Sequence, residues 1–511
     1  MTAVVLAVLP FKLFELDRYF VPKELVLHAV ALAVMVLVLS RTRTITVDAV
    51  DALLVVFLLW GSASALFATN YWLAQRALGV SVSSAIIFWA AKWRGASGAH
   101  RPILVAAAVA TVCAAVTGLA QAYGVETDYF SLNRAPGGTF GNRNFVAHFC
   151  AIGLPALIYA TVTARRSLGL VLGFIGVGAV AAALVLSRSR AAWLAVVASL
   201  VMLAVPLLAS RKYWADRKIG ARLTRLALAA GLGGGLAIFL PNRLNWSSDS
   251  PYLDSARGMV DYRTGSGRGR LAQYENSARM AAAHPVFGVG PGNWPVRYVR
   301  FAPANDPSLT DEGMTANPWP SSDWVAFVSE RGVVAACALL AAFAVMLLRA
   351  CRRWSDLASS DAVLAKVALV GTISATLVVS AFDAALLLAA PAFLAWSVMG
   401  AASGIGHRGR EIRVPSAARA IAIVAMVSVV AISTARSATQ SAAIVSVGNG
   451  ATRAGWIRGA GLDPGSYRIN VRVAELYAGR GQCASARIYA RRALTLFPYA
   501  PVPRQLLSRC G

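Results

Sequence analysis

Two pairs of arginines border short polar turns of this chain, and their chemistry would suit the binding of a phosphate group. Arg188 and Arg190 lie in "VLSRSRAAWL", between two apolar segments with almost no loop between them, and Arg268 and Arg270 lie in "GSGRGRLAQY". A guanidinium stays charged and can donate two parallel hydrogen bonds to phosphate oxygens. The first pair could instead extend its charged ends from a membrane span to the water interface, so both interpretations stay open.

A glycine-rich turn offers further hydrogen-bond donors. The segment "APGGTFGNRNFVAHF", residues 135–149, places Asn142, Arg143 and Asn144 directly before an apolar segment. Its glycines allow a tight turn with exposed backbone N–H groups, which could bind an anionic head group. The same residues could equally cap a helix.

Carboxylates enter the apolar part of the chain at two places. Asp323 and Glu330 follow a loop in "NPWPSSDWVAFVSERG", and their spacing puts them on one helical face, about two turns apart. Asp383 lies in "SAFDAALLLAAP", near another segment boundary. Ionisable groups at membrane depth are costly, which makes these residues candidates for chemistry.

A rigid turn separates the second arginine pair from these carboxylates. Arg268 and Arg270 are expected to precede an amphipathic helix that runs to about Ala283, and "HPVFGVGPGNW" follows it. Because His284 stands directly before a proline, it is predicted to end the helix rather than to act as a base.

The elements that must position these residues are membrane-spanning helices. The 511 residues are 57% hydrophobic and 14% charged, whereas soluble domains have about a quarter charged residues. Apolar windows of about 17–25 residues, long enough to cross a bilayer, recur about thirteen times. We expect an all-α polytopic membrane protein with about 12–13 transmembrane helices. The expected spans lie near 1–14, 25–40, 47–67, 77–93, 102–123, 145–164, 167–187, 190–210, 223–240, 323–348, 363–382, 385–403 and 417–435.

The distribution of Lys and Arg orients these spans. If Met1 is cytoplasmic, most Lys and Arg residues of the short loops fall on the cytoplasmic side. The net charge of +26 is then mainly an orientation signal rather than a sign of nucleic-acid binding. All the candidate residues above, a loop at 241–322 and the C-terminal tail fall on the other side. This division predicts a transmembrane domain over 1–435, including the loop, and a tail over 436–511.

The tail has the period of a tetratricopeptide unit. Pro464 and Pro498 are 34 residues apart, with small and aromatic residues at the positions such a helical repeat uses. One repeat cannot form a solenoid alone, so we expect a small helical appendage packed on its neighbours. Cys483 and Cys510 could form a disulfide in an oxidising compartment, although spacing alone does not decide it. The tail's excess of arginines fits either a solvated cap or a surface for anionic lipid or glycan.

Taken together and in this order, the motifs resemble those of the O-antigen ligase and polysaccharide polymerase superfamily of bacterial inner-membrane glycosyltransferases. The resemblance covers residues from about 47 to 403. "GGTFGNRNF" is similar to the family's G-T-F-G-N-x-N-F, "SRSRAAWL" to S-R-x-x-W-L, and "HPVFGVGPGNW" to H-P-x-x-G-x-G-x-x-x-[FW]. "DWVAFVSERGVVA" and "FDAALLLAAPAFLAWSVMG" are similar to the two closing motifs.

The resemblance implies a function. Such enzymes transfer a glycan from an undecaprenyl diphosphate carrier to an acceptor at the periplasmic face, without a metal or other cofactor. Lipid A core, a growing polysaccharide or a protein hydroxyl would all fit as acceptor, and membrane lipids surround the site. The catalytic residues implied are Arg190 and Arg270, which would hold the diphosphate, and Asp323. The substrate-binding residues implied are Arg188, Arg268, Asn142, Arg143, Asn144, Ser321 and Asp383.

The chain departs from the family at one position. When Glu330 and Gly332 are aligned with the family's E-x-G motif, Ser321 falls where the family has a histidine, the presumed general base. Glu330 itself is expected to serve helix packing rather than chemistry. Asp323 could replace that base, since a desolvated carboxylate gains basicity. Alternatively, the acceptor needs little activation, or the protein binds or moves a lipid-linked glycan without transferring it. A polymerase that extends a lipid-linked glycan is a further alternative to a ligase, and a transporter of lipid-linked sugar is another, which would carry polar residues through to the cytoplasmic side.

Overall fold

The structure is a computed structural model of the whole chain. It describes residues 1–511 except 40–43, 247, 249, 259–264, 311, 353, 358, 407, 408, 414, 415 and 511.

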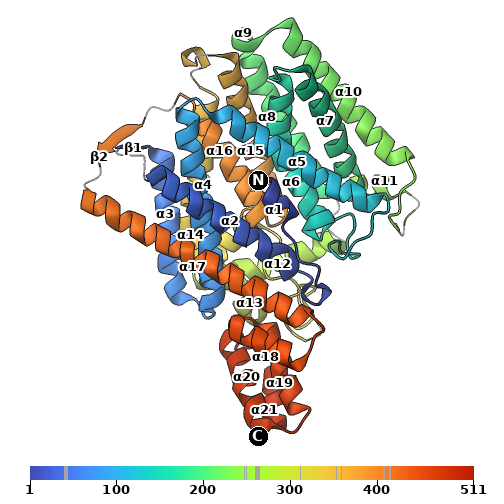
Figure 1. Cartoon of the computed structure of the whole chain (residues 1–511), viewed down its shortest axis with the longest axis vertical. Coiled ribbons are helices and arrows are strands. Elements are labelled where there is room, and N and C mark those ends of the chain that lie inside the picture. The colour runs from blue at the N-terminus through green and yellow to red at the C-terminus, as the bar shows by residue number, and fades with distance from the viewer. Residues whose placement is uncertain are drawn as a thin grey trace.

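Long apolar helices make up most of the molecule, which confirms the expected all-α polytopic fold (Figure 1). Eleven helices formed by the described residues are long and apolar enough to cross a membrane. These are α2 (Asp17–Leu39), α3 (Ala49–Ser64), α4 (Tyr71–Ala96), α5 (His100–Ala122), α6 (Arg143–Val162), α7 (Ser167–Ser187), α8 (Arg190–Ala209), α10 (Arg217–Phe239), α14 (Asp323–Ala350), α15 (Ser360–Phe382) and α17 (Ser416–Gly448).

Two expected spans take a different form. At residues 1–14 the structure has a five-residue helix, α1 (Thr2–Leu6), and a 3₁₀ turn, Lys12–Phe14, with Pro10 between them. Neither piece is long enough to cross a bilayer. The span expected at 385–403 becomes α16 (Ala389–Gly404), which has 16 residues, nearly all of them buried. It packs inside the bundle, which explains why its sequence is apolar although the helix is short.

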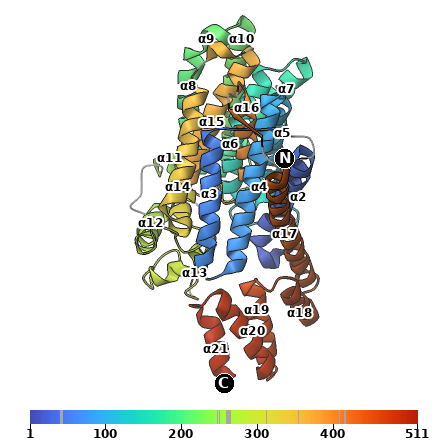
Figure 2. The same ribbon diagram turned by 90° about the vertical axis from the view of Figure 1, so that its left-hand side faces the viewer.

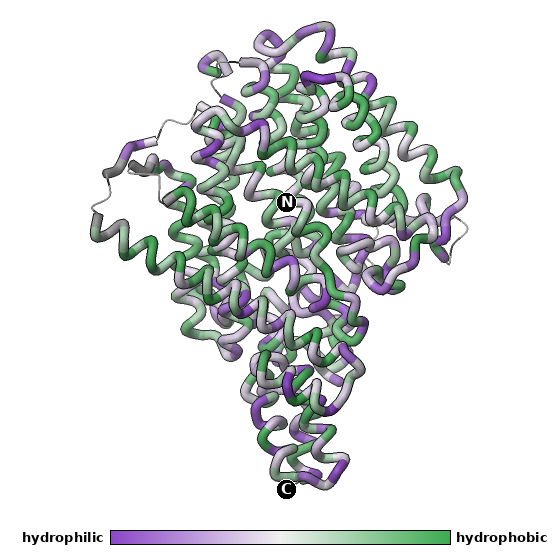
Figure 3. Tube along the Cα trace, in the orientation of Figure 1, coloured by the Kyte–Doolittle hydropathy of each residue, from purple (hydrophilic) through white to green (hydrophobic). Residues whose placement is uncertain are grey.

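The helices pack as a bundle with one continuous apolar core. The closest neighbours are α4 with α16, α7 with α10, α8 with α15, α5 with α6, α3 with α14 and α2 with α17. The views in Figures 1 and 2 show these helices running through the body of the molecule, with α9 (Arg211–Trp214) at one end and the C-terminal tail projecting at the other. Figure 3 shows apolar residues concentrated in the body and hydrophilic residues at the ends, as expected of a multi-pass membrane protein.

The two ends of the bundle carry different elements. One end, here called the site face, carries α11 (Pro251–Arg257), α12 (Gly265–Ala283), α13 (Trp294–Arg297) and the tail. The other end, here called the opposite face, carries α9 and the N-terminal end of α3. A two-stranded antiparallel sheet pairs β1 (Thr44–Val47) with β2 (Arg410–Arg413), in the register Thr44 opposite Arg413.

The tail consists of α18 (Arg453–Leu462), α19 (Tyr467–Ala478), α20 (Cys483–Leu496) and α21 (Pro501–Arg509). Residue 435, the expected domain boundary, lies inside α17, which runs to Gly448. Arg436 on α17 forms an ion pair of 2.6 Å with Asp463, and Asn70 of the bundle donates a hydrogen bond to the Leu496 carbonyl. The tail is therefore packed on the bundle.

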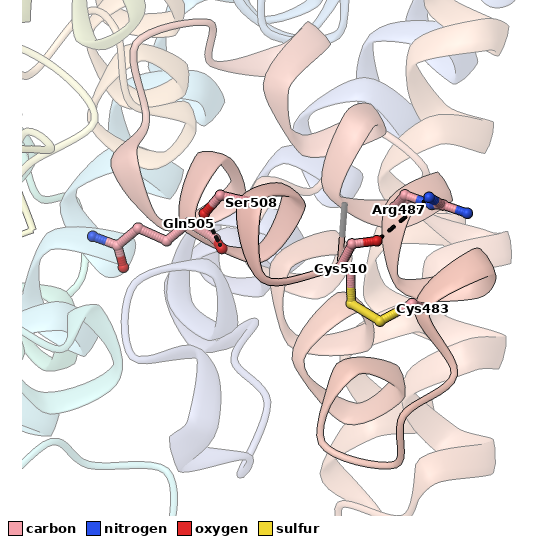
Figure 4. The surroundings of a disulfide bond; sticks show 5 residues. All are labelled: Cys483, Arg487, Gln505, Ser508 and Cys510. Atoms are coloured by element: carbon pink, nitrogen blue, oxygen red, sulfur yellow. Dashed lines mark hydrogen bonds between the residues drawn. A yellow bond between two sulfur atoms is a disulfide. The ribbon is translucent and has the colours of Figure 1, made fainter.

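A disulfide closes the end of the tail. Cys483 at the start of α20 is bonded to Cys510 after α21, with 5.1 Å between their Cα atoms (Figure 4). The pairing that the sequence left open is present in the structure. Arg487, one turn further along α20, donates a hydrogen bond to the Cys510 carbonyl. This hydrogen bond is a second contact between α20 and the end of the chain.

Candidate functional site

A cavity of about 430 Å³ lies at the site face. It is bordered by α6, the turn between α7 and α8, α12, and the segments that enter α14 and leave α15. The residues that the sequence singled out and that line this site cavity are Asn142, Arg143, Asn144, Arg188, Arg190, Arg270, Ser321 and Asp383. Segments that are distant along the chain therefore meet around one space.

The site cavity is strongly cationic. Its arginines are Arg134, Arg143, Arg188, Arg190 and Arg270, and among its described lining residues the only carboxylate is that of Asp383. An excess of fixed positive charge in a concave site attracts anions and raises their local concentration. The sequence singled out four of these arginines. Arg134 was not singled out, although it lies in the same polar turn region as the glycine-rich segment.

An indole ring orients two of the guanidiniums. The Cζ atoms of Arg143 and Arg188 lie 5.1 and 4.6 Å from the centre of the Trp246 ring. Such cation–π contacts hold a cation over the ring face. Arg188 also donates a hydrogen bond of 2.8 Å from Nε to the hydroxyl of Ser255. Burial lowers the pKa of Arg188, but a guanidinium stays protonated in proteins, so its charge is kept.

The hinge between α7 and α8 directs the first arginine pair as expected. Arg188 ends α7 in the left-handed conformation, with φ of 54°, and Arg190 is the first residue of α8. A guanidinium N–H of Arg190 donates to the carbonyl of Gly258, just after α11. The site-face segments are thus tied to the hinge.

The second arginine pair divides. Helix α12 begins at Gly265, so Arg268 and Arg270 lie within its first turns rather than before it. Residues two positions apart on a helix point in different directions. Arg270 lines the site cavity, whereas Arg268 is exposed and is not a lining residue. The helix ends at Ala283, directly before His284, as predicted.

Asp323 does not line the site cavity either. Its side chain is fully buried, and its carboxylate accepts hydrogen bonds from the backbone N–H groups of Ala385, Leu386 and Leu387, at 2.9, 2.7 and 3.2 Å. A carboxylate so engaged is a cap for the chain segment after α15. The structure therefore places Asp323 where it holds the segment that begins with Asp383, rather than where an acceptor would meet it.

The carboxylate within the site cavity belongs to Asp383. Its Oδ2 lies 4.0 Å from Nε2 of His148, and the same nitrogen lies 3.4 Å from the hydroxyl of Ser189. His148 is buried, and its Nδ1 has no hydrogen-bond partner among the described residues. The sequence did not single out His148, which belongs to a different segment from the position of the family's histidine. Its position four residues after Asn144, on the same face of α6, is the signal that could have found it.

Ser321, at the position of the family's histidine, is a lining residue held by its backbone. Its N–H donates to Oε1 of Gln273 at 2.6 Å, and its carbonyl accepts from the hydroxyl of Tyr274 at 2.7 Å. Both partners lie on α12, which therefore fixes the entrance to α14. Within the described residues, no group of three or more His, Cys, Asp and Glu side chains is arranged to hold a metal ion.

Glu330 and Gly332 anchor the rigid turn after α12. The Glu330 carboxylate accepts from the N–H groups of Gly292 and Trp294, at 2.7 and 3.1 Å. Gly332 has φ of 81°, and a Cβ there would lie 1.9 Å from the carbonyl oxygen of Val286. Only glycine allows this close approach. Glu330 was expected to serve helix packing, and in the structure its carboxylate holds the turn after α12 against α14.

An aromatic stack secures the tip of this turn. The ring of Phe287 stacks on Trp60 and on Phe67, with 5.0 Å between centres in each case. The indole N–H of Trp60 also donates to the Val286 carbonyl at 2.8 Å. The turn thereby fixes α12, which carries Arg270, against α3 and α14.

The fold and this site define a polytopic α-helical membrane protein with an arginine-lined cavity at one end of its bundle. A family model described as O-antigen ligase matches residues 175–340. This match supports the O-antigen ligase superfamily and, in general terms, ligase- or polymerase-type activity on polysaccharides. The matched range contains Arg188, Arg190 and Arg270. No curated protein matches the chain.

Proposed function

We propose that the protein transfers a glycan from an undecaprenyl diphosphate carrier to an acceptor hydroxyl at the periplasmic face of the bacterial inner membrane. The observation that carries this proposal is the convergence of five arginines from separate segments on one cavity. The resemblance to the superfamily suggests the undecaprenyl diphosphate carrier, and the charge distribution suggests the compartment. The opposite face carries Arg211, Lys212 and Lys218 in and beside α9, in keeping with a cytoplasmic location.

The arginines would bind the donor and stabilise its leaving group. As the glycosidic bond breaks, negative charge grows on the diphosphate, and guanidiniums fixed in advance stabilise that charge without having to reorganise. Arg190 on α8 and Arg270 on α12 both line the site cavity, and would bind the diphosphate between them. Arg188 and Arg143, both held over Trp246, would extend the grip.

In the reaction, the acceptor oxygen would form a bond to the anomeric carbon while the bond from that carbon to the diphosphate oxygen breaks. The carrier would leave with the electron pair, and the acceptor's hydroxyl proton would pass to a base. We assign that base to Asp383, because its carboxylate lines the site cavity and the buried imidazole of His148 lies behind it. Asp323 would act as a positioning residue for the segment that carries Asp383.

The neutral groups of the site cavity suit a sugar. Asn144, Gln273 and Ser321 offer amide and hydroxyl groups near the arginines, and Trp319 offers an apolar ring face. Lipid A core, a polysaccharide end or a protein hydroxyl are the acceptors proposed. A polymerase of the same superfamily differs only in that its acceptor is itself lipid-linked.

The experiment is the glycan phenotype of a strain that lacks this protein. Unlinked chains accumulating on the carrier would identify a ligase, and single repeat units on the carrier would identify a polymerase. The wild-type gene should correct either defect and restore normal glycans. The Asp383→Asn variant at equal expression should not. Normal glycans in the deletion strain would refute the transfer function, and full restoration by Asp383→Asn would remove that residue from the mechanism.

The alternative of a binder or transporter predicts a different result. A cavity of about 20 Å³ within the bundle, beside Phe57, Phe327 and Leu339, is mainly apolar and holds no more than a water molecule. An apolar cavity of this size offers a glycan no polar route, which favours a surface enzyme over a transporter. If the protein is a transporter, the carrier-linked glycan should stay on the cytoplasmic side in the deletion strain. Labelling the glycan in inside-out and right-side-out membrane vesicles would detect this.

A further inference from the structure

A second cavity, of about 410 Å³, lies at the opposite face. It is bordered by the first residues of α3, the C-terminal ends of α4, α14 and α16, and the first turns of α15. Lys366 of this cavity and Asp383 of the site cavity lie near opposite ends of α15, so at 1.5 Å per residue the two cavities are roughly 25 Å apart. None of the residues of this second cavity has a part in the proposed glycan transfer.

Cations outnumber carboxylates around the second cavity. Its charged lining residues are Lys92, Arg349, Arg352 and Lys366, against Asp48 and Asp356. Lys92 is neutralised, because its ammonium lies 2.9 Å from Asp48 and 2.6 Å from Asp51. The carboxylate of Asp48 also pairs with Arg349 at 2.8 Å. The excess positive charge therefore resides elsewhere.

Lys366 is the buried part of that excess. Its side chain is on the second turn of α15 and only 8% exposed. Among the described residues its ammonium donates one long hydrogen bond, of 3.5 Å, to the carbonyl of Ser403, and no carboxylate pairs with it. The buried hydroxyl of Ser403 also lacks a partner there. Burying an unpaired cation is costly, and an anion in the second cavity would offset that cost.

The walls of the second cavity are amphipathic. Leu357, which is half-buried, and Ile405, which is 8% exposed, give the cavity an apolar wall, whereas Arg352 is exposed. A soluble phosphate would make no use of the apolar surface. A lipid presents both a phosphate and hydrocarbon, and a cationic site at the ends of membrane-spanning helices lies at the depth of lipid head groups.

We propose that the second cavity binds the phosphate of an anionic phospholipid between Lys366 and Arg352, with the adjoining glycerol and acyl carbons against Leu357 and Ile405. This site is independent of the proposed transfer reaction, and the failure of one would leave the other standing. Its role would be to fix the cytoplasmic ends of α14 and α15, the two helices whose other ends border the site cavity.

The test is native mass spectrometry of the full-length protein in detergent, titrated with phosphatidylglycerol or with phosphatidylcholine. Phosphatidylglycerol should bind the wild type more tightly. Lys366→Met should weaken that binding about fivefold, the effect of removing one cation near a lipid phosphate. Lys366→Arg should retain it. Lys212→Met, which removes an exposed lysine of α9 at the same face and away from the cavity, should also retain it.

Arg352→Ala provides a second variant, because its side chain is exposed and its loss should not disturb folding. It should weaken phosphatidylglycerol binding by a similar factor. Equal binding of the two lipids, or unchanged binding in both Lys366→Met and Arg352→Ala, would overturn the proposal. Inorganic phosphate provides the third arm: if millimolar phosphate displaces the lipid completely, the occupant is a soluble anion and the lipid assignment is wrong.

Discussion

Oδ2 of Asp383 lies 4.0 Å from Nε2 of His148 at the inner wall of the arginine-lined cavity. The two residues come from the end of α15 and the second turn of α6. Asp383 is partly exposed to the site cavity, whereas His148 is almost fully buried behind it. In the proposed reaction, an imidazole in this place would pack behind the carboxylate that acts as base, in a chain with Ser321 at the position where the superfamily it resembles has a histidine.

Replacing Asp383 tests this arrangement. Asp383→Asn should lower the rate of glycan transfer by about 10²–10⁴-fold, the usual contribution of a general base. His148→Gln should lower it less, because it changes only the buried ring that lies behind the carboxylate. Transfer would be measured in membranes at equal protein level, with Glu275→Gln, an exposed carboxylate on α12, as control. A wild-type rate in Asp383→Asn would contradict the assignment.

Asp323 should behave as a structural anchor. Asp323→Asn replaces an acceptor of three backbone hydrogen bonds with a group that also carries donors, and should lower the free energy of unfolding by about 1–3 kcal/mol. Its transfer rate should fall without a change in the pH profile. Thermal unfolding in detergent measures the first effect, with Asp216→Asn, an exposed helix cap, as control. A stable variant with a displaced pH profile would instead restore Asp323 as the base.

Gly332 should tolerate no side chain. In Gly332→Ala the new Cβ would meet the Val286 carbonyl, and the residue would be held at a positive φ, so we expect a loss of about 1–3 kcal/mol or more in unfolding free energy. Gly235→Ala is the matched control, because nothing lies within 4 Å of its Cβ position on α10. Equal unfolding temperatures for the two variants would show that the turn after α12 is not docked as described.

Low pH should reduce the stability of the protein, because Asp48 at the opposite face loses its negative charge. Burial alone would raise its pKa, but the hydrogen bond and charge of Lys92 and the charge of Arg349 lower it to about 2. An unfolded aspartate has a pKa of about 3.9. The stabilisation by ionised Asp48 is therefore complete above about pH 4 and is lost as the pH falls through 2. The difference in unfolding temperature between wild type and Asp48→Asn should shrink as the pH falls from 5 to 2, and a constant difference would refute this.

The sequence predicted the scaffold well, because hydrophobicity and length determine which segments cross a membrane. Most expected spans are helices within a few residues of their predicted bounds, and the hinge at Arg188 and Arg190 is as expected. The exceptions are informative. The segment 1–14 is apolar because it packs against α2 and α5, and α16 is apolar because it is buried within the bundle.

The site was predicted in part. Motif spacing brought out most of the lining arginines, but it could not say which way a helical side chain faces, and Arg268 points away. Asp323 stood out as a carboxylate at membrane depth, yet its partners are backbone N–H groups of a segment about sixty residues later, which no local pattern reveals. The proximity of His148 to Asp383 likewise depends on tertiary packing of α6 beside α15.

The most direct test of the central claim is the release of undecaprenyl diphosphate by purified protein given a carrier-linked glycan and acceptor membranes. Wild-type protein and Arg279→Ala, which removes an exposed arginine of α12 outside the site cavity, should release the carrier at equal rates. Arg190→Ala and Arg270→Ala should each lower that rate by about 10²–10³-fold, the usual effect of removing one group that stabilises a transition-state charge. Unchanged release in both variants would contradict the account.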